Sequence, residues 1–423
     1  TYSLVEQAFD GYGLLAPVTV TVENANAEET PATTDVANCP TEFVLTKIDA
    51  ETKAVLAGVT FALKDAEGKA VSLAQMKDGT YRPTSVVVNM EAVEKNTDTV
   101  LTDSAGKITI QYLNYGKYTL DEKQIAGYAP LTGIAFTITS AHSTEKPLTL
   151  TVENIPASLI VKKTDAVTKT ALPDTRFTLK DADGKVIKLI LEKNGAYRPA
   201  KSGEKGLDEL TMGADGTATV KYITGKVTVH ESGAPVGFAY AADKTVEVGT
   251  VAIPAVGGDK AKAVATVEIA DLPLMLKISK VHSKTLKPLK GAAFQIMADG
   301  DTKTPLTFVL KDGVYWYSKA GTVTTLTMDA NAQAFVCGLP AVKYRLVESV
   351  VPSGFFPAPA QDFTLLLTHT SEKPLEITVT NTPEVKLGLD SDKWDDVLLI
   401  GGGVLLLAGA AVFFLRRKRR IAR

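Results

Sequence analysis

The sequence predicts an all-β protein in which tandem antiparallel β-sandwich modules are followed by one C-terminal transmembrane helix. Three observations predict this. Short strands with period-two apolar alternation recur in three similar blocks. Gly, Asp and Asn turns separate these strands, and no long amphipathic helix pattern interrupts them. One wholly apolar stretch lies near the C-terminus, and 423 residues are too many for a single hydrophobic core.

The repeats divide the chain into three full modules, called modules one, two and three, at 41–157, 158–273 and 274–385. Each opens with an alternating strand that leads into a lysine, written FVLTKID, LIVKKTD and LKISKVH in chain order. Each then has a box that reads GKYTLDE, GKVTVHE or VKYRLVE, followed by a loop with Gly, Pro and an aromatic residue. Each closes with PLTLTVENIP, ATVEIADLP or PLEITVTNTP. The repetition therefore predicts one sandwich per copy.

The first residues contain only the last elements of such a module, TYSLVE and VTVTVEN. We therefore expect 1–24 to be the C-terminal remnant of a preceding β-sandwich. Residues 25–40 have no hydrophobic run and are predicted to be a linker. Position 1 is Thr and no secretory signal precedes the first strand, so an outward-facing chain of this kind is expected to be part of a longer one.

The C-terminal end predicts a membrane anchor. Residues 397–415 are all apolar or Gly, and as a helix they would span roughly 28 Å, about one hydrocarbon core. A buried core helix would be amphipathic, and this stretch has no polar face. The basic tail 416–423 predicts a cytoplasmic C-terminus, so the modules and the juxtamembrane linker 386–396 are expected outside the cell.

The distribution of charge argues against binding of nucleic acid. The chain has 46 basic and 48 acidic residues, and six of the basic residues lie in the tail 416–423. The remainder holds 40 basic against 48 acidic residues, a balance of −8. Because nucleic acid is bound by a basic face on the folded part, an acidic body is the wrong partner for it.

Polar residues recur on strand faces that should point inward. Side chains two positions apart share one face of a strand, so the stripe of Phe43 and Leu45 continues to Lys47. Stripes in the GKYTLDE box and in the closing strand likewise end on Glu122 and Asn154. The corresponding residues elsewhere are Lys163, Glu231 and Asp271 in module two, Lys280, Glu348 and Asn381 in module three, and Glu6 and Asn24 in the remnant.

A buried, unpaired charge is costly, so each inward lysine, carboxylate and amide should meet its neighbours. One interpretation is a buried Lys–Glu ion pair hydrogen-bonded to the amide, or strand-end residues that reach into water. The other is chemical: burial lowers the pKa of the lysine and raises that of the Glu, which yields a neutral, nucleophilic amine. A protonated Glu would polarise the amide carbonyl and pass a proton to departing ammonia. The product would be an amide crosslink between the first and last strands.

The lysine-bearing opening strand, the YxLxE box with its loop and the closing VxN resemble the prealbumin-like (SpaA/Cna B-type) modules of Gram-positive pilins and adhesins. The resemblance covers nearly everything before the membrane segment. It implies Ig-like, prealbumin-like sandwiches, each with a self-formed isopeptide bond and a catalytic Glu. Carried over, the bonds would be Lys47–Asn154, Lys163–Asp271 and Lys280–Asn381, promoted by Glu122, Glu231 and Glu348.

Two positions depart from this family pattern. Asp271 stands where the other modules have Asn, so a bond in module two would release water in place of ammonia. His282 stands where the other modules have an Asp after the lysine, which leaves the turn at that strand end open.

Taken together, these features predict the structural stalk of a bacterial cell-surface protein, adhesin-like or minor pilin-like, that projects an N-terminal functional domain. Two alternatives remain open: a spacer of a surface-anchored enzyme, and modules that themselves bind host matrix or glycans. No enzyme activity beyond self-crosslinking is expected. The stretch NTPEVKLGLDSDKWDD contains no LPxTG-like sortase site, and no Tyr-Pro-Lys motif of a polymerising shaft occurs. Attachment by a sortase is therefore left open.

The expected partners are the membrane, through the C-terminal helix, and host extracellular matrix or other surface proteins, through the N-terminal part. No cofactor and no metal ion are expected. The four histidines, His142, His230, His282 and His369, lack metal-ligand spacing. The sequence also has no P-loop, no dinucleotide fingerprint and no Ser-His-Asp order.

Overall fold

The computed structural model describes residues 1–87 and 92–384. They belong to two compact units, one of Thr1–Leu274 with Leu366–Lys373, and one that runs from Met275 to Leu365 and resumes at Pro374. Within the described ranges, no helix is long and apolar enough to cross a membrane. The predicted linker 386–396, membrane segment 397–415 and basic tail 416–423 lie outside these ranges.

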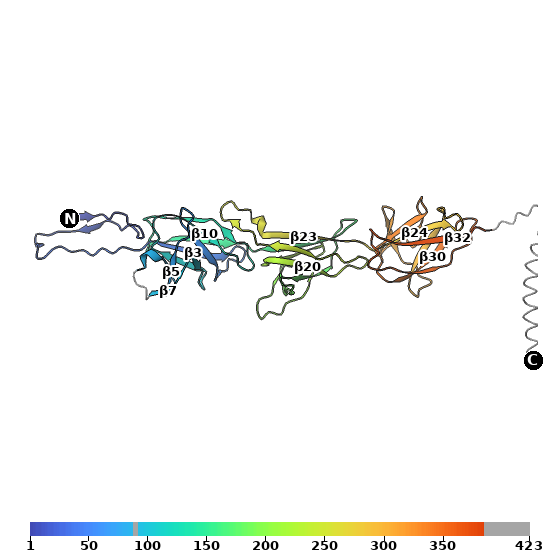
Figure 1. Ribbon diagram of the computed structural model, residues 1–423, viewed down its shortest axis with the longest axis horizontal. Helices are drawn as coiled ribbons and strands as arrows, with labels where there is room; N and C mark the ends of the chain where they lie inside the picture. Colours follow the sequence, from blue (N-terminus) through green and yellow to red (C-terminus); the bar gives the residue numbers. More distant parts are fainter. Residues whose placement is uncertain (88–91, 385–423) are drawn as a thin grey trace, which may run out of the picture. The chain divides into compact units, whose positions relative to one another are not determined.

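Module one is a sandwich of two β-sheets (Figure 1). The larger sheet has six strands in the order β13-β3-β9-β6-β5-β7, and the smaller has four in the order β12-β10-β4-β8. Its described elements are β3 (Glu42–Asp49), β4 (Thr60–Lys64), β5 (Leu73–Met76), β6 (Tyr81–Pro83), the 3-10 helix η1 (Thr84–Val86), β7 (Val93–Thr97), β8 (Thr99–Leu101), β9 (Lys107–Gln111), β10 (Gly116–Glu122), β11 (Leu131–Thr132), β12 (Ile134–Ile138) and β13 (Leu148–Asn154).

Module two repeats this plan with a five-stranded sheet, β16-β17-β19-β14-β23, and a four-stranded sheet, β18-β15-β20-β21. Its elements are β14 (Ser158–Asp165), β15 (Arg176–Lys180), β16 (Leu189–Leu191), β17 (Tyr197–Pro199), β18 (Leu210–Thr211), β19 (Thr217–Lys221), β20 (Gly225–Gly233), β21 (Lys244–Val248), β22 (Ile253–Pro254), η3 (Lys260–Ala263) and β23 (Val264–Asp271).

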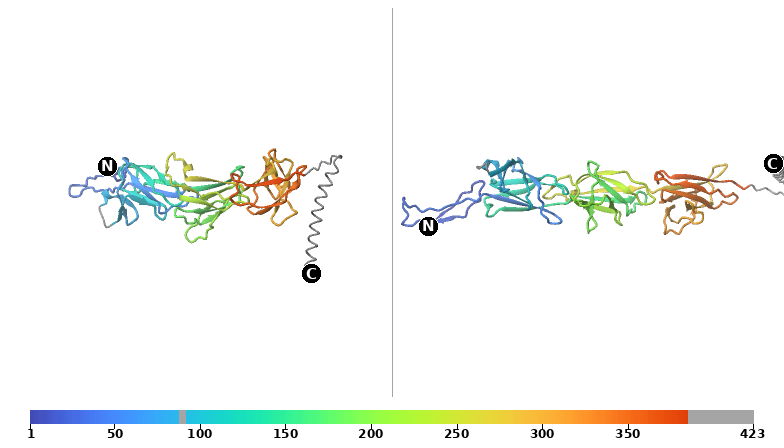
Figure 2. Two further views of the ribbon diagram at one scale, coloured as in Figure 1. Left: turned by 45° about the vertical axis from the view of Figure 1, so that its right-hand side comes forward. Right: turned by 90° about the horizontal axis from the view of Figure 1, so that it is seen from below.

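Module three has the same two layers, β26-β27-β29-β24-β32 and β28-β25-β30-β31. Its strands are β24 (Met275–His282), β25 (Ala293–Ala298), β26 (Phe308–Lys311), β27 (Val314–Tyr317), β28 (Leu326–Thr327), β29 (Gln333–Cys337), β30 (Lys343–Val350), β31 (Gln361–Thr364) and β32 (Leu375–Asn381). Figure 2 shows the paired layers of the modules from two further directions. The prediction of an all-β chain built from tandem sandwiches is confirmed.

The first and last strands of every module lie side by side and run parallel. β3 pairs with β13, β14 with β23, and β24 with β32. The prediction of antiparallel sandwiches is therefore wrong at this pair, and it is wrong again where β6, β17 and β27 pair in parallel with β9, β19 and β29. A parallel pair needs a long crossover, and here nearly the whole module lies between its two members.

The core of module one lies between its two sheets, where the predicted apolar stripes meet. β3 alternates strictly between buried and half-buried residues, as a strand with one face on a core should. Phe43 and Leu45 of β3 and Leu120 of β10 are fully buried. The rings of Phe43 and Phe136 stack with their centroids 3.9 Å apart, which locks the two sheets together. The same packing carries Lys47, the next inward residue of β3, into the interior.

The turn after each first strand is closed by the side chain of the strand's last residue. Asp49 Oδ1 accepts hydrogen bonds from the backbone N–H groups two and three positions later, both at 2.7 Å. Asp165 does the same in module two. In module three, His282 Nδ1 accepts from the equivalent N–H groups at 3.1 and 3.4 Å. An imidazole nitrogen thus replaces the carboxylate. The turn after the first strand of module three, which the sequence did not predict, has the same form as in modules one and two.

Replacing His282 with Ala should destabilise module three by about 1 kcal/mol, because two turn N–H groups lose their acceptor. His282→Asp restores a carboxylate of the kind found in modules one and two and should preserve stability. Chemical denaturation followed by the fluorescence of Trp316 in β27 measures both variants. Equal losses in the two variants would contradict the proposed role of the imidazole nitrogen.

Candidate crosslinking site

The parallel pairing of β3 and β13 brings Lys47 next to Asn154. Lys47 lies directly opposite Val152, and Asn154 is two positions further along the same strand face. The other modules repeat this diagonal: Lys163 lies opposite Ile269, two positions before Asp271, and Lys280 lies opposite Val379, two positions before Asn381. The register of the first and last strands therefore creates the same juxtaposition three times.

The carboxylate comes from the opposite sheet. Glu122 is the last residue of β10 and pairs across the strands with Phe61 of β4. Glu231 and Glu348 hold the same positions on β20 and β30, opposite Phe177 and Phe294. Each site is therefore assembled from both layers, and it forms only when the sandwich closes.

In module one the three side chains are buried and in contact. Lys47 Nζ lies 3.8 Å from Glu122 Oε2, and neither side chain is exposed to solvent. Asn154 donates a hydrogen bond from Nδ2 to Glu122 Oε1 at 2.5 Å. Lys47 Nζ and Asn154 Oδ1 have no hydrogen-bond partner among the described residues. The carboxylate thus contacts the amide nitrogen, whereas the sequence-based mechanism had placed it on the carbonyl oxygen.

Burial sets the protonation of this pair. Removal from water lowers the pKa of Lys47 to about 8, against a smaller opposing effect of the Glu122 charge. Burial likewise raises the pKa of Glu122, although Lys47 and the hydrogen bonds from Asn154 and Leu131 oppose it. The two values approach each other, so transfer of a proton from the amine to the carboxylate becomes inexpensive.

Module two places an acid where the others have an amide. Lys163 Nζ contacts Asp271 Oδ1 and lies 3.0 Å from Glu231 Oε1, with all three side chains at most 1% exposed. Burial raises the pKa of Asp271 to about 7, the Glu231 charge adds to the rise, and Lys163 opposes it. Two carboxyl groups share one lysine here, so one of them favours the protonated form.

Module three matches module one in its residues. Lys280 Nζ contacts Asn381 Oδ1 and lies 3.1 Å from Glu348 Oε1. Asn381 Nδ2 donates to both oxygens of Glu348, at 2.9 and 3.1 Å. Desolvation lowers the pKa of Lys280, and Glu348 partly offsets that effect. The structure therefore brings together all nine residues singled out in the three full modules.

Two contributions to the sites were missed at the sequence level. The first is a phenylalanine under each amine: Lys47, Lys163 and Lys280 lie 5.9, 5.5 and 5.7 Å from the ring centroids of Phe61, Phe177 and Phe294. A ring face attracts a cation and is otherwise apolar. It therefore shields the amine from water while still attracting its charged form. The recurrent Phe in VTFALK, RFTLK and AAFQIM was a visible signal of this residue.

The second is a backbone donor from the loop that follows each box. Glu122 Oε2 accepts from the N–H of Leu131 at 3.0 Å. Glu231 accepts from Ala241 and Glu348 from Ala358, both at 2.7 Å. No side-chain pattern identifies a backbone donor, so only the fold could reveal it.

The first 40 residues follow the same plan as the end of module one. Tyr2 pairs with Val20 as Tyr118 pairs with Phe136, a constant shift of 116 positions (118 − 2 and 136 − 20). The strands concerned are β1 (Tyr2–Leu4) and β2 (Val18–Val20). Glu6 Oε2 accepts from the N–H of a leucine nine positions later, as Glu122 does.

This register gives Asn24 a different counterpart in module one from the one predicted. With a shift of 116 positions, the exposed Asn24 is the counterpart of Ser140, which lies in the loop before the last strand of module one. The counterpart of Asn154 is then Asn38. The bridge between Tyr12 and Pro40, which repeats at Tyr128 and Pro156, supports the same shift. Residues 25–40, predicted to be a linker, thus occupy the positions of the closing loop and strand of module one, although they form no strand.

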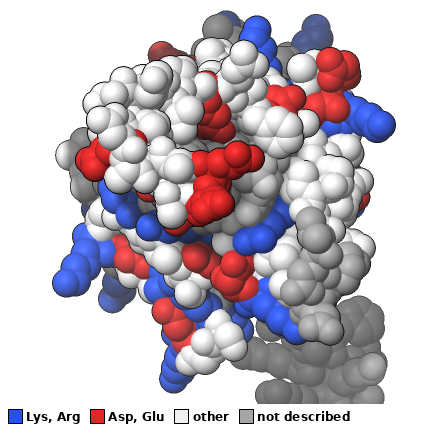
Figure 3. Space-filling view, turned by 90° about the vertical axis from the view of Figure 1, so that its left-hand side faces the viewer, with Lys and Arg blue, Asp and Glu red and all other residues white. Residues whose placement is uncertain are grey.

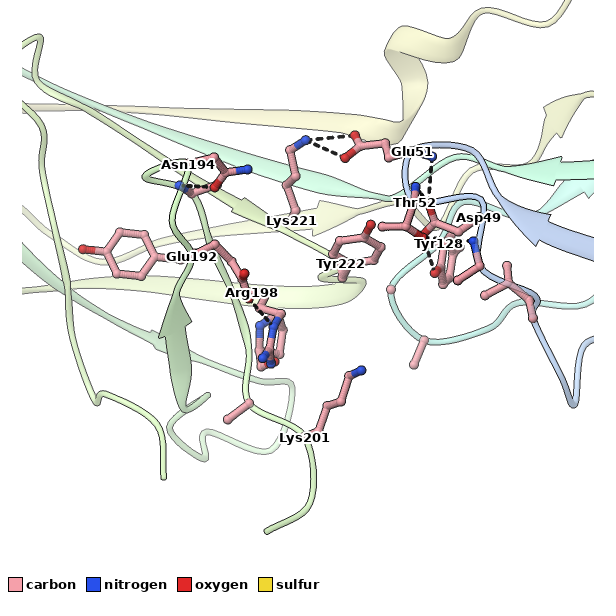
Figure 4. Close-up of a pocket in the computed structure, with 18 of the residues that line it drawn as sticks. Asp49, Glu51, Thr52, Tyr128, Glu192, Asn194, Arg198, Lys201, Lys221 and Tyr222 are labelled. Carbon is pink, nitrogen blue, oxygen red and sulfur yellow. Dashed lines mark hydrogen bonds and ion pairs between the residues drawn. The ribbon is translucent and has the colours of Figure 1, made fainter. Parts of the chain in front are cut away.

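A cleft of about 660 Å³ lies where modules one and two meet (Figure 4). Lys221 of module two forms hydrogen bonds with both carboxylate oxygens of Glu51, and Tyr128 donates to Asp49 Oδ2 at 2.7 Å. Burial of Asp49 would raise its pKa, yet its hydrogen bonds together lower it. The lining of this cleft contains none of the nine lysine, carboxylate and amide residues described above.

The described part of the chain carries charged side chains of both signs on its surface (Figure 3). Figure 3, which looks onto the side of the N-terminal segment, shows acidic and basic side chains interspersed on that face. No group of three or more His, Cys, Asp or Glu side chains is placed to hold a metal ion in residues 1–87 and 92–384.

The chain is similar to several solved structures, pilins among them. The Bacillus anthracis TIE protein is 18% identical, with 81% of this chain and 51% of that chain covered and a TM-score of 0.31. This chain thus spans about half the length of that protein. A streptococcal ancillary pilin is 17% identical, with 82% and 100% covered and a TM-score of 0.28. The shaft pilin of Lactobacillus rhamnosus GG is 18% identical, with 55% and 97% covered and a TM-score of 0.25.

No curated protein matches the chain. A family model described as a prealbumin-like fold domain, SpaA, matches residues 41–154, 157–259 and 275–383. These three matches follow the three sandwiches and together cover most of the 423 residues. The chain therefore belongs to the SpaA family of prealbumin-like fold domains.

Proposed function

We propose that the three modules form a stalk of a Gram-positive cell-surface protein, and that each module closes itself with an amide crosslink between its first and last strands. The observation that carries this proposal is the full burial of a lysine beside a carboxyl group and an amide or acid, three times over. An ion pair alone is a poor reason for such a site, because its desolvation can exceed its Coulombic gain. A role in bond formation explains why the arrangement recurs.

In module one the reaction would begin with transfer of a proton from Lys47 to Glu122. The neutral Nζ attacks Cγ of Asn154, and the Nζ–Cγ bond forms as the carbonyl becomes tetrahedral. Glu122 then delivers its proton to Nδ2, the atom it already contacts, and takes one from the attacking nitrogen in its place. The Cγ–Nδ2 bond then breaks, ammonia leaves, and the carboxyl proton is released to it as ammonium. Module three has the same atoms for the same sequence of steps.

Module two would differ in its leaving group. A carboxylate is not attacked by an amine, so Asp271 must be protonated for its hydroxyl to depart as water. The raised pKa of Asp271 supplies that form near neutral pH. Glu231, 3.0 Å from the amine, would serve as the proton carrier.

The position of the crosslink suits a load-bearing element. The chain enters module one through β3 and leaves through β13, and these strands are parallel neighbours, so tension on the two ends would shear them apart. A bond from Lys47 to Asn154 would carry that tension directly and bypass residues 48–153. The bonds in modules two and three would bypass similar lengths, since their partners are 108 and 101 positions apart.

The stalk would be held at the cell surface by its C-terminal end. The segment 397–415 would anchor it in the membrane, with 416–423 inside the cell and the modules outside. Residues 1–40 would be the end of a fourth module, with Glu6 and Asn38 in the roles of Glu122 and Asn154. A domain further toward the N-terminus would contact host matrix or other surface proteins. Attachment by a sortase is left open, because the stretch NTPEVKLGLDSDKWDD contains no LPxTG-like site.

Glu122→Gln should abolish the crosslink in module one, because an amide cannot carry the proton. Intact-mass measurement of the wild-type chain should show loss of two ammonia molecules and one water. The variant should retain one of these ammonia molecules, and peptide mapping should find Lys47 and Asn154 unlinked. Loss of a crosslink around a loop of about 100 residues should also cost about 4.7 kcal/mol in the chain-entropy account.

Module three serves as the internal control for this variant, since its Lys280–Asn381 peptide should remain crosslinked. A wild-type mass equal to that of the plain sequence would overturn the proposed crosslinks in all three modules at once.

The crosslink of module two should form more slowly as the pH rises above about 7. Its acceptor Asp271 ionises there, whereas the amide acceptor of module one does not titrate. Module one should show no such decline until the pH exceeds about 8, the pKa of Lys47, because below that value its Lys47–Glu122 pair keeps the one proton that the reaction uses. Peptide mapping of newly synthesised chain, incubated between pH 6 and 9, gives the ratio of the two rates.

Asp271→Asn is the matched variant for this pH dependence. It should release ammonia in place of water and lose the decline above pH 7. An unchanged decline in the variant would show that a group other than Asp271 controls the rate.

A further inference from the structure

Module two carries an extended connection that the other modules lack. The segment 249–263 joins β21 to β23, whereas the corresponding connections are 139–147 in module one and 365–374 in module three. We call residues 249–263 the strap. It is the yellow segment beside the module-one strands in Figure 1 and in the left view of Figure 2.

The strap adds a short strand to module one. Its β22 pairs in parallel with β11, with Ile253 opposite Leu131. Ile253 N–H donates to the carbonyl of Pro130, and Ala255 N–H donates to that of Thr132, both at 2.8 Å. These are backbone bonds of the kind that hold a sheet together, so the strap is docked rather than merely adjacent.

The strap also fills the core of module one. Ile253 is 1% exposed and Ala263 is fully buried, and both pack in the cluster formed by Phe43, Phe61 and Leu120. They take no part in the separate core cluster of module two. Module one is therefore completed by residues that lie about a hundred positions beyond its own last strand.

Docking occurs at the loop that serves the crosslinking site. Leu131, the partner of Ile253, donates its N–H to Glu122 Oε2 at 3.0 Å. Leu131 is buried, whereas its counterparts Ala241 and Ala358, together with Leu15 in the N-terminal segment, are half-buried. Among the four described copies of this donor, the one beneath the strap is thus the one shielded from water.

We propose that Ile253 is a positioning residue for crosslinking in module one, and that the strap of module two must dock before Lys47 reacts efficiently with Asn154. Ile253 covers the loop that holds Glu122 and fixes the N–H that orients its carboxyl group. The inference rests on the proposed crosslinking function, and it adds an order: module two folds and docks, and module one then closes.

The physical basis is the exclusion of water from the proton carrier. A dry site disfavours the charged forms of both Glu122 and Lys47 and so raises the fraction of the reactive neutral pair. Without the strap, water reaches Leu131 and its neighbours, the ion pair becomes more stable, and the neutral pair becomes rarer. Lys47, Glu122 and Asn154 themselves remain in place, because their own strands hold them.

The test compares Ile253→Ser with Val256→Ser in the full chain. Val256 lies on the same strap but is 83% exposed, so its replacement controls for composition without disturbing the docked face. Cell-free synthesis is stopped, and the crosslinked Lys47–Asn154 peptide is followed over time by mass spectrometry. Ile253→Ser should slow its appearance about tenfold, since proton transfer contributes about 10²–10⁴-fold and only its positioning is weakened. Val256→Ser should match the wild type.

Two further readouts separate positioning from general destabilisation. Ile253→Leu should restore most of the rate, and the Lys280–Asn381 peptide should form at the wild-type rate in every variant. The acid limb of the pH–rate profile of module one should move to lower pH in Ile253→Ser, because better solvation lowers the pKa of Glu122. A folding defect alone would reduce the yield and leave that limb unmoved.

The outcomes are distinct for the two proposals. Equal rates in wild type and Ile253→Ser, with the crosslink present in both, would overturn the role of the strap and leave the crosslinks standing. Absence of the Lys47–Asn154 and Lys280–Asn381 crosslinks from the wild type would overturn the crosslinking function itself, and the role of the strap with it.

Discussion

Each module is organised around a lysine that its first strand carries into the interior. Removing an ammonium group from water costs several kcal/mol even after relaxation, and an unpaired one would destabilise so small a sandwich. The surrounding residues offset that desolvation cost. They are a carboxylate from the opposite sheet, an amide or acid from the last strand, and a phenylalanine ring beneath the amine. The two sheets must close around this lysine together, so the site forms only when the sandwich folds.

The parallel pairing of the first and last strands determines how tension on the chain would act on each module. An antiparallel pair would bring both ends of the chain to the same edge, whereas β3 and β13 enter at one end and leave at the other. Tension would therefore act along the pair and oppose many backbone hydrogen bonds at once. The lysine and its acceptor lie across this seam, where a covalent bond would exclude the rest of the module from the path of the force.

Modules one and two are also less independent than their repeats imply. Ile253 and Ala263 pack in the core of module one although they belong to module two. Lys221 and Glu51 pair across the same boundary, and the rings of Tyr128 and Tyr222 meet edge to face 5.6 Å apart. Such contacts couple the stability of one module to the folding of the next, so neither is expected to behave as it would alone.

The sequence by itself determined the repeat, the strand periodicity and the inward polar residues, because side-chain alternation is a local property of a strand. Lys47, Glu122 and Asn154 could be selected before any fold was known, since all three end apolar stripes. Only the tertiary structure decided the parallel register that joins lysine to acceptor, the backbone N–H of Leu131, and the contact of the carboxylate with the amide nitrogen.

The N-terminal segment shows the same limit of prediction from sequence alone. VTVTVEN resembles a closing strand in its letters, yet its residues Val18–Val20 pair with β1 as β12 pairs with β10 in module one. The position equivalent to Asn154 is therefore Asn38 and not Asn24. The alternating pattern of a strand is the same whichever neighbour it pairs with, and pairing partners are chosen across long sequence separations. For that reason the sequence could name the kinds of residue in these sites, while their partners and the module-two strap followed only from the fold.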